Sequence, residues 1–355
     1  MNKQDFKSLS ALNGPILITG HTGFKGQWLT FLFEELGLKV IGISKEPLKD
    51  SLYELANQNG RIPEIFTDIC DPVKVQSFVR KHKPQVVFHL AAQALVLESY
   101  KNPVETFQTN VMGTANLLNI CFNEDFVQSI VVSTTDKVYK NLNSGKLFVE
   151  SDSLGGKDPY SASKVGTESV ISAWQQIREM NGGPQVTAVR AGNVIGGGDL
   201  AENRLMPDIA RGLINGTPIR IRNANSTRPW QHVLDPLIGY VLVAEAHLKG
   251  KEIDAINFGP LEESLRVGEV CEIVSDISEI KLDFKYDEVE ANSKLQYESV
   301  FLDLNSSKAH SELGWKPNWS QKEAISLTVE WWQKTLNNKV EPRKSCLEDI
   351  RKILT

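Results

Sequence analysis

Tyr160 and Lys164 form the pattern with the clearest chemical meaning in the sequence. They are the first and last residues of YSASK, and on a helix such i and i+4 positions share one face. A lysine ammonium beside a phenol favours the phenolate, which lowers the pKa of the tyrosine towards that of a useful general base. A solvated helix face is the alternative interpretation. Pro159 before the pair and a glycine-rich loop upstream favour the base.

A second polar group, Thr135-Asp136-Lys137, directly follows the apolar segment 130–133. Such a segment predicts a buried strand, and the strands of open α/β sheets end at the crevice that holds the ligand. The three side chains are therefore expected at the ligand site. The alternative is a simple turn after a strand.

The segment 16–26, ILITGHTGFKG, predicts a dinucleotide-binding loop between a strand and a helix. Gly20, Gly23 and Gly26 allow a tight turn, close approach of the backbone to a pyrophosphate, and close packing of the helix on the strand. The helix N-terminus then offers free N–H groups and positive potential to the phosphates. The spacing is GxxGxxG rather than GxGxxG, so the position at the first strand–helix junction carries the prediction.

The residues expected near the adenosine ribose leave NAD and NADP both open. An NAD site usually has an acidic residue after the second strand, where this chain has Ser44 and Lys45. A hydroxyl and a cation would tolerate a 2′-phosphate. Asp68, after the third strand, is expected either to contact the adenine or to be a turn residue in TDICDP.

Short apolar runs alternate with amphipathic stretches as far as residue 190, which is the pattern of parallel βαβ units covered on both faces. We expect strands at 16–18, 40–43, 64–66, 86–90, 130–133 and 186–189, and helices at 27–36, 72–81, 104–121 and 161–180. The predicted fold is a doubly wound, Rossmann-like parallel α/β sheet with a smaller mixed α/β domain for the substrate.

Beyond Gly192 the chain becomes rich in glycine, proline and arginine, and helical patterns return at 266–280 and 321–336. We expect a dinucleotide-binding domain over residues 1–190, with part of its sheet completed by later segments. Residues 191–340 are expected to form mainly the substrate domain. Residues 341–355 are expected to be a charged tail, forming a loosely docked helix.

The composition favours a globular enzyme of the cytoplasm. Of 355 residues 41% are hydrophobic, and 39 basic against 44 acidic residues give a net charge of −5, which argues against a general nucleic-acid binder. Four widely spaced cysteines and scattered histidines predict neither a disulfide framework nor a metal site. A polar beginning and the lack of an apolar run of about 18 residues predict no signal peptide and no membrane span.

Together these motifs resemble the extended short-chain dehydrogenase/reductase family across most of the chain. The matching segments are TGHTGFKG (19–26), HLAAQ (89–93), NVMGT (110–114), YSASK (160–164), VRAGNVIG (189–196) and LGWKP (313–317). Within the family the chain looks most like the nucleotide-sugar 4,6-dehydratases, through TDK (135–137), AGNVIGGGD (191–199), RLMPDIARG (204–212) and RPWQHVLDP (228–236). The Asp136-Lys137 pair resembles the subgroup that acts on CDP-glucose, because most deoxythymidine-linked relatives have Asp-Glu there.

The resemblance implies NAD as the cofactor, a nucleotide sugar as the substrate, and a homodimer built on helices 104–121 and 161–180. The implied cofactor contacts are Gly20, Thr22, Gly23, Phe24, Gly26, Asp68, Ile69, Ala91, Ala92, Gln93, Tyr160 and Lys164. The implied substrate contacts are Asn193, Arg204, Arg220, Arg222 and Arg228. Among these, Arg228 matches the diphosphate-binding arginine of the family, and a planar guanidinium suits a diphosphate.

The resemblance also implies an internal redox cycle. Tyr160 takes the proton of the sugar 4-hydroxyl with help from Lys164, Thr135 positions the 4-oxygen, and Asp136 protonates the departing 6-hydroxyl. Lys137 is either the base that takes the C5 proton, which requires a neutral amine, or a cation that stabilises the enolate.

The alternatives to a CDP-sugar dehydratase are a nucleotide-sugar 4-epimerase, a dehydratase for a different nucleotide sugar, and a nucleotide-binding protein without catalysis. Asp136-Lys137 argues against the epimerase. The intact set of Thr135, Tyr160 and Lys164 argues against a protein that only binds.

Overall fold

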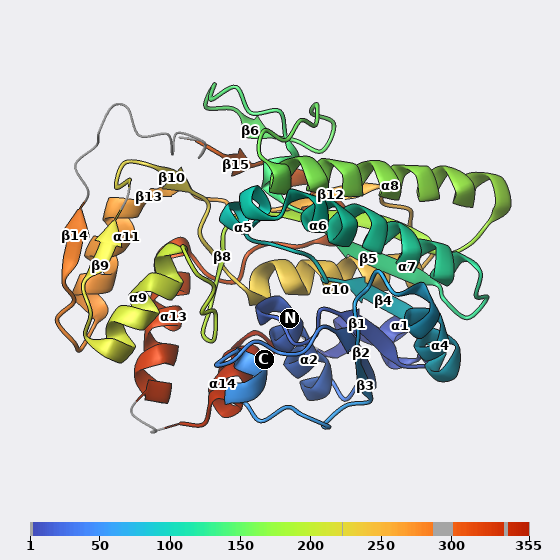
Figure 1. The fold of residues 1–355 in the computed structure, drawn as a ribbon, viewed down its shortest axis with the longest axis horizontal. Coiled ribbons are helices and arrows are strands. Elements are labelled where there is room, and N and C mark those ends of the chain that lie inside the picture. Colours follow the sequence, from blue (N-terminus) through green and yellow to red (C-terminus); the bar gives the residue numbers. More distant parts are fainter. Residues whose placement is uncertain (1–2, 222, 287–300, 337–339, 355) are drawn as a thin grey trace.

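The computed structural model describes residues 3–221, 223–286, 301–336 and 340–354. Its centre is a parallel sheet of seven strands in the order β12-β7-β5-β4-β1-β2-β3 (Figure 1). The strands are β1 (Ile16–Thr19), β2 (Val40–Ser44), β3 (Glu64–Phe66), β4 (Val86–His89), β5 (Ser129–Ser133), β7 (Gln185–Ala191) and β12 (Ala255–Phe258). The predicted doubly wound α/β fold is confirmed.

Strand β1 lies where the winding of the sheet reverses. Ile16 is in register with Val40 of β2 on one side and with Val86 of β4 on the other. The chain first builds β2 and β3 outward from β1, and then β4, β5 and β7 in the opposite direction. The connections leaving β1 and β4 therefore diverge, and a crevice for a ligand is expected at their carboxyl ends.

Helices cover both faces of this sheet. They are α2 (Phe24–Glu35), α4 (Pro72–His82), α7 (Gly113–Phe122), α8 (Pro159–Asn181) and α10 (Leu234–Leu248), and α14 (Pro342–Leu354) packs against α2. Successive side chains of a strand point to opposite faces, so Ile16 and Ile18 pack in one core with α2 and α10, whereas Leu17 packs in a second core with α4, α7 and α8. This double burial explains the nearly continuous apolar strands of the sequence.

The expected single helix over 104–121 is interrupted. The structure has α6 (Pro103–Phe107), a π-helical turn η2 (Gln108–Met112) and then α7. At the turn, the carbonyl oxygen of Asn110 accepts the hydroxyls of Thr114 at 2.7 Å and Thr167 at 2.8 Å. A π turn places one more residue in the helical circuit and often marks a functional position. Hydrophobic periodicity has no signal for it.

Most of the remaining strands lie at the left and top of Figure 1. The short strands pair as β9 (Ile219–Ile221) with β14 (Phe284–Tyr286), β10 (Thr227–Arg228) with β13 (Leu265–Arg266), β8 (Val194–Ile195) with β11 (Gln231–His232), and β6 (Leu147–Phe148) with β15 (Asp303–Leu304). The other helices are η1 (Lys3–Phe6), α1 (Lys7–Ser10), α3 (Leu52–Leu55), α5 (Val96–Lys101), η3 (Asp136–Val138), α9 (Leu205–Asn215), α11 (Val267–Ile277), α12 (Ser307–Leu313) and α13 (Gln321–Leu336).

The last helix is part of the core, so the expectation of a loosely docked tail is wrong. Cys346 and Ile350 of α14 are fully buried. Arg343 and Arg351 form ion pairs with Glu34 and Glu35 at the end of α2, at 2.8 and 2.9 Å. The many charges of this segment occupy the other face of an amphipathic helix, which the composition alone did not separate from its buried face.

Candidate active site

The three glycines of the first loop are required for three different steric reasons. Gly20 has a φ of +75°, and a Cβ there would lie 2.8 Å from the backbone nitrogen of Ala91. A Cβ on Gly26 would lie 2.2 Å from the carbonyl oxygen of Gly20, so only glycine lets α2 approach the end of β1 this closely. Gly23 is exposed and has an ordinary φ of −78°. Its missing side chain therefore leaves room on the outside of the loop.

The N-terminus of α2 is open to an anion. Gly23 is its N-cap, and no side chain caps the helix, so its first N–H groups remain available to a ligand. Phe24 packs against Gly196, and Thr22 shares a 2.6 Å hydrogen bond with Ser44. A twelve-residue helix with a bare, glycine-lined N-terminus at the switch point of the sheet fits the diphosphate of a dinucleotide.

Lys45, expected near the adenosine ribose, is paired with two carboxylates. Its ammonium lies 3.0 Å from Asp68 and 3.3 Å from Glu105 of α6. The pairing raises the pKa of Lys45, and the pKa of Asp68 is lowered by the backbone N–H of Cys70 and by Lys45, so both of these groups carry charge near neutral pH. The charges around this position therefore sum to −1. Ile69, the next residue, is buried against Gly113.

The loop after β4 is tied to the helices behind it. The loop contains Ala91, Ala92 and Gln93, and Ala91 donates its backbone N–H to the Thr19 hydroxyl at 3.3 Å. The Asn110 side chain accepts the N–H of Gln93 at 2.9 Å, donates to the Gln93 carbonyl at 3.0 Å, and donates to Ser163 of α8 at 2.9 Å. Asn110 thus joins this loop to the helix that carries Tyr160 and Lys164.

Thr135, Asp136 and Lys137 lie at the carboxyl end of β5, where the short helix η3 begins. The Thr135 hydroxyl donates to Asp136 at 3.0 Å and accepts the backbone N–H of Lys137 at 3.3 Å. Burial raises the pKa of the Asp136 carboxyl, against the opposing effects of Lys137, Thr135 and Arg228. Asp136 is therefore suited to hold and donate a proton, while the Lys137 side chain is half-buried.

Tyr160 and Lys164 stand in the first turns of α8, and both are buried, so the alternative of a solvated helix face is wrong. The Lys164 ammonium donates to the carbonyl of Ser133 at 3.0 Å. Burial raises the pKa of Tyr160 to about 12, although Arg204 and a hydrogen bond with Thr135 act to lower it. Burial and Lys25 lower the pKa of Lys164 to about 8. The expected lowering of the tyrosine pKa by the lysine is not found: burial raises this pKa, and the groups that oppose the rise are Arg204 and Thr135 rather than Lys164.

The arginines predicted to bind substrate are not all in one place. Arg204 lies 3.6 Å from Asp199, donates to the Ala94 carbonyl at 3.4 Å, and is close enough to Tyr160 to influence its pKa. Arg228 donates to the Thr227 carbonyl at 2.7 Å and acts on Asp136.

The other predicted substrate residues are placed differently. The backbone carbonyl of Asn193 accepts the backbone N–H of Gln231 at 3.2 Å. Arg220 is exposed on β9, at the left of Figure 1. Arg222 lies outside the described residues.

Comparisons with known proteins show the family of the chain. The profile of the GDP-mannose 4,6-dehydratase family matches residues 17–328. The chain belongs to this family. It is 39% identical over 329 residues to the CDP-glucose 4,6-dehydratase of Salmonella typhimurium, covering 89% of each chain. It is 28% identical to the dTDP-glucose 4,6-dehydratase of Haemophilus influenzae, over 89% of this chain and 97% of the relative.

Solved structures of nucleotide-sugar enzymes share the fold. A dTDP-glucose 4,6-dehydratase from Streptomyces venezuelae, solved with NAD, has a TM-score of 0.75 at 24% identity and covers 93% of this chain and 99% of its own. A UDP-glucose 4-epimerase from Stenotrophomonas maltophila, also with NAD, has a TM-score of 0.80 at 20% identity, over 92% and 100% of the two chains. At these identities the comparison concerns the fold alone.

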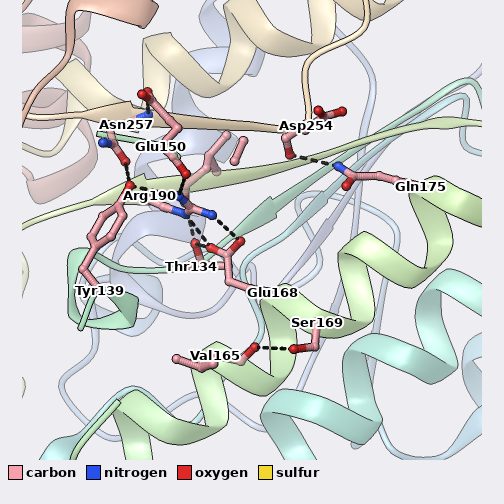
Figure 2. A network of polar contacts seen from close by, with 12 residues as sticks. Thr134, Tyr139, Glu150, Val165, Glu168, Ser169, Gln175, Arg190, Asp254 and Asn257 are labelled. Carbon is pink, nitrogen blue, oxygen red and sulfur yellow. Dashed lines mark hydrogen bonds and ion pairs between the residues drawn. The ribbon is translucent and has the colours of Figure 1, made fainter. Parts of the chain in front are cut away.

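In this member of the GDP-mannose 4,6-dehydratase family, a buried polar network behind the site was missed by the sequence analysis (Figure 2). Glu168 and Arg190 are its charged members, and Thr134, Tyr139 and Asn257 are bonded to them or to each other. Two signals were available. Glu168 follows Lys164 by four residues, which puts both on one helix face, and Arg190 is a charged residue in a strand whose other residues are uncharged.

The described residues contain no group of three or more His, Cys, Asp or Glu side chains arranged to hold a metal ion. None of the described helices is both long and apolar enough to cross a membrane.

Alanine substitutions at Gly26 and Gly23 should separate packing from ligand binding. Gly26→Ala should destabilise the fold, by about 2 kcal/mol or more, because the new methyl group overlaps backbone that has no room to move. Gly23→Ala should cost clearly less stability than Gly26→Ala, because its nearest contact, with the Gly20 carbonyl oxygen, is 3.3 Å rather than 2.2 Å and its φ is ordinary. It should weaken the binding of NAD, used as the probe, by narrowing the approach to the helix N-terminus.

The measurements are urea unfolding followed by circular dichroism, and titration with NAD followed by tryptophan fluorescence. Equal loss of stability in both variants, or undiminished NAD binding by Gly23→Ala, would contradict the roles assigned to the two glycines.

Proposed function

We propose that this protein is a nucleotide-sugar 4,6-dehydratase that converts CDP-glucose into CDP-4-keto-6-deoxyglucose and water, with NAD as cofactor. The observation that carries the proposal is the buried Asp136, with its raised pKa, at the same end of the sheet as Thr135, Tyr160 and Lys164. A 4-epimerase, which only inverts the configuration of a hydroxyl, does not need an additional acid. A dehydratase needs one to protonate the departing hydroxyl. The name of the Salmonella typhimurium relative supports the choice of CDP-glucose.

The first half of the reaction takes place at C4 of the sugar. When bound, NAD supplies a nicotinamide ring that takes a hydride from C4 and returns a hydride at C6. In its phenolate form, Tyr160 would accept the proton of the 4-hydroxyl. The Thr135 hydroxyl, which acts to lower the pKa of Tyr160, would hold the 4-oxygen beside it by turning its proton away from Asp136. Arg204 favours the phenolate electrostatically. The Lys164 ammonium keeps its place through the Ser133 carbonyl.

The second half of the reaction removes water across C5 and C6, and the resulting double bond would then take up the hydride at C6 and a proton again at C5. The 4-ketone makes the C5 proton acidic, and the protonated Asp136 donates its proton to the departing 6-hydroxyl. Lys137 follows Asp136 on η3 and would act in the same step. It would be either the base that takes the C5 proton or a cation that stabilises the enolate oxygen. Its hydrogen bond to Thr135 comes from its backbone, so its side chain stays available for either role.

The proposed division of labour follows the layout of the chain. Residues 1–190 would hold the cofactor, and residues 191–340 would hold most of the nucleotide sugar. Arg228 near Asp136 and Arg204 near Tyr160 would place positive charge beside the diphosphate and the sugar. Asn193, in the loop before β8, and Arg220, on β9, are further proposed contacts.

Incubation with a panel of nucleotide sugars tests the function directly. The protein with NAD is offered CDP-glucose, dTDP-glucose, GDP-mannose and UDP-N-acetylglucosamine in separate reactions, and the products are analysed by mass spectrometry. Loss of one water from CDP-glucose alone is expected. Water loss from a different sugar would keep the chemistry and discard the substrate, and configurational change without mass change, seen by NMR, would indicate a 4-epimerase.

The Asp136→Asn variant should stop the reaction after its first half. Asparagine keeps the size of the side chain but has no acidic proton, so water loss should slow by about 100-fold or more. Mass spectrometry should then detect a nucleotide sugar that has lost two hydrogens but retains its 6-hydroxyl. The exposed Asp125→Asn is the matched control and should behave as the wild type. If Asp136→Asn catalysed water loss at the wild-type rate, Asp136 could not be the acid that protonates the departing 6-hydroxyl.

The paired state of Lys45 supports NAD over NADP. The two carboxylates of Asp68 and Glu105 already neutralise its ammonium and leave one excess negative charge. A 2′-phosphate placed there would meet net repulsion rather than a free cation. Lys45 is the cation that made NADP a possible cofactor in the sequence analysis. It could bind a 2′-phosphate only by giving up its ion pairs with Asp68 and Glu105.

Glu105→Gln should raise the affinity for NADP relative to NAD, because it frees part of the Lys45 charge. The pair is exposed, so about a two- to fivefold change in the ratio of dissociation constants is expected at low salt, fading as salt is added. Glu98→Gln on α5 is the control, since its ion pair is with Lys101. Tighter binding of NADP than of NAD by the wild type would sink the assignment.

We also propose that the protein is a homodimer formed through α6, η2 and α8. Large apolar side chains are exposed along these helices, at Val104, Phe107 and Met112 and again at Ile177 and Met180. A concentration of exposed apolar residues on neighbouring helices is typical of an interaction surface. A second copy of the chain would bury it by forming a four-helix bundle.

Light scattering at micromolar concentration should give twice the monomer mass. The double variant Val104→Lys/Phe107→Lys should give the monomer mass, because four lysines would face each other across the proposed symmetric interface. Val73→Lys changes a similarly exposed valine on α4 and should leave the dimer intact. A monomeric wild type would contradict this assembly.

A further inference from the structure

Glu168 and Arg190 form a bidentate ion pair inside the protein, directly behind the proposed catalytic residues (Figure 2). Arg190 donates through Nε and Nη2 to the two carboxylate oxygens, both at 2.8 Å. Each side chain is only 5% exposed. Removing two charges from water is costly, and apolar residues of similar size are often equally stable in such places. The pair is therefore better explained by what it holds than by stability alone.

The network around the pair reaches each segment that carries a reacting group. The Thr134 hydroxyl donates to Glu168 at 2.6 Å, and Thr134 directly precedes Thr135. Arg190 donates through Nη1 to the Tyr139 hydroxyl at 2.9 Å, at the end of the turn that begins with Asp136. Glu168 itself belongs to α8 and lies one turn after Lys164, so the network also includes this helix. Three segments are thus fixed relative to one another.

Glu168 also supplies the negative charge near the Lys164 amine. Among the described residues that act on this amine, Lys25 of α2 is a cation, and His89 of β4 is neutral because burial lowers its pKa to about 3. Glu168 opposes the lowering of the Lys164 pKa by burial and by Lys25. On the far side of the carboxylate, the charged and titratable groups are Arg190, Tyr139 and Glu150.

We propose that Glu168 is a positioning residue of the reaction, which holds Lys164 in its charged form against the Ser133 carbonyl and fixes the end of β5 through Thr134. Arg190 acts by holding Glu168. This inference rests on the proposed dehydratase function, in which Lys164 and Thr135 flank the base Tyr160. It adds to that function a group that touches neither substrate nor cofactor.

The Glu168→Gln variant tests the proposal. Glutamine keeps the shape of the side chain and removes its charge, so Lys164 should lose its proton at lower pH. We expect kcat for CDP-glucose to fall at least about tenfold and the alkaline limb of its pH profile to move down by about one pH unit, with KM changed less than twofold. Ser169→Ala, the exposed neighbour that bonds only to the Val165 carbonyl, is the matched control.

A second variant covers a failure of the first to fold. Glu168→Gln leaves the Arg190 cation unpaired, whereas Glu168→Gln/Arg190→Gln removes both buried charges together and should preserve the fold. Its pH profile should shift in the same direction. Wild-type profiles in a folded variant, or loss of the fold in both variants as judged by circular dichroism, would overturn the proposal in favour of a purely structural pair.

A binding measurement separates this inference from the proposed function. NAD titrations of the wild type and both variants across the alkaline range report the Lys164 charge without any turnover. If the wild type does not convert CDP-glucose, the dehydratase proposal fails, while a downward shift in the pH at which NAD affinity is lost still supports the role of Glu168. The absence of that shift counts against Glu168, whatever the wild type converts.

Discussion

The carbonyl group of Gly20 sets how closely helix α2 can lie to the sheet, and the site is arranged around that distance. Its oxygen accepts the N–H of Gly23 at 3.0 Å, and it leaves no room for a side chain on Gly26. On its other side, Gly20 lies against the backbone of Ala91 at the end of β4. The open helix N-terminus and the loop after β4 are thus brought to the same crevice by contacts that only glycine permits.

Burial gives the reacting groups their proton affinities. It raises the pKa of both Asp136 and Tyr160 and lowers that of Lys164, so each group is pushed towards its neutral form. Charges brought by Arg204, Arg228 and Glu168 act in the opposite direction. This balance places proton acceptors and donors in a dry site, where small changes in nearby charge have large effects.

The sequence was informative wherever a short pattern has one structural meaning. Alternating apolar strands predicted the parallel sheet, and the glycine loop and the Tyr160–Lys164 pair were found at the ends of the expected elements. Contacts between distant residues were not predictable in this way. The sequence shows Lys45 as a cation that would tolerate a 2′-phosphate, but it does not show the pairing of Lys45 with Glu105, which is sixty residues away in the chain and belongs to a helix. The electrostatic environment of Tyr160 depends similarly on Arg204, a residue of a distant loop.

The last strand of the large sheet comes late in the chain. β12 pairs with β7, yet more than sixty residues, including α9 and α10, separate the two strands. During synthesis, β7 therefore remains an unpaired apolar edge until residue 258 has emerged, and such an edge is prone to pair with other chains. Because Asn257 of β12 also bonds to Tyr139, the network behind the proposed catalytic residues closes only at this stage. The folding order thus ties completion of the site to arrival of the segments proposed to bind substrate.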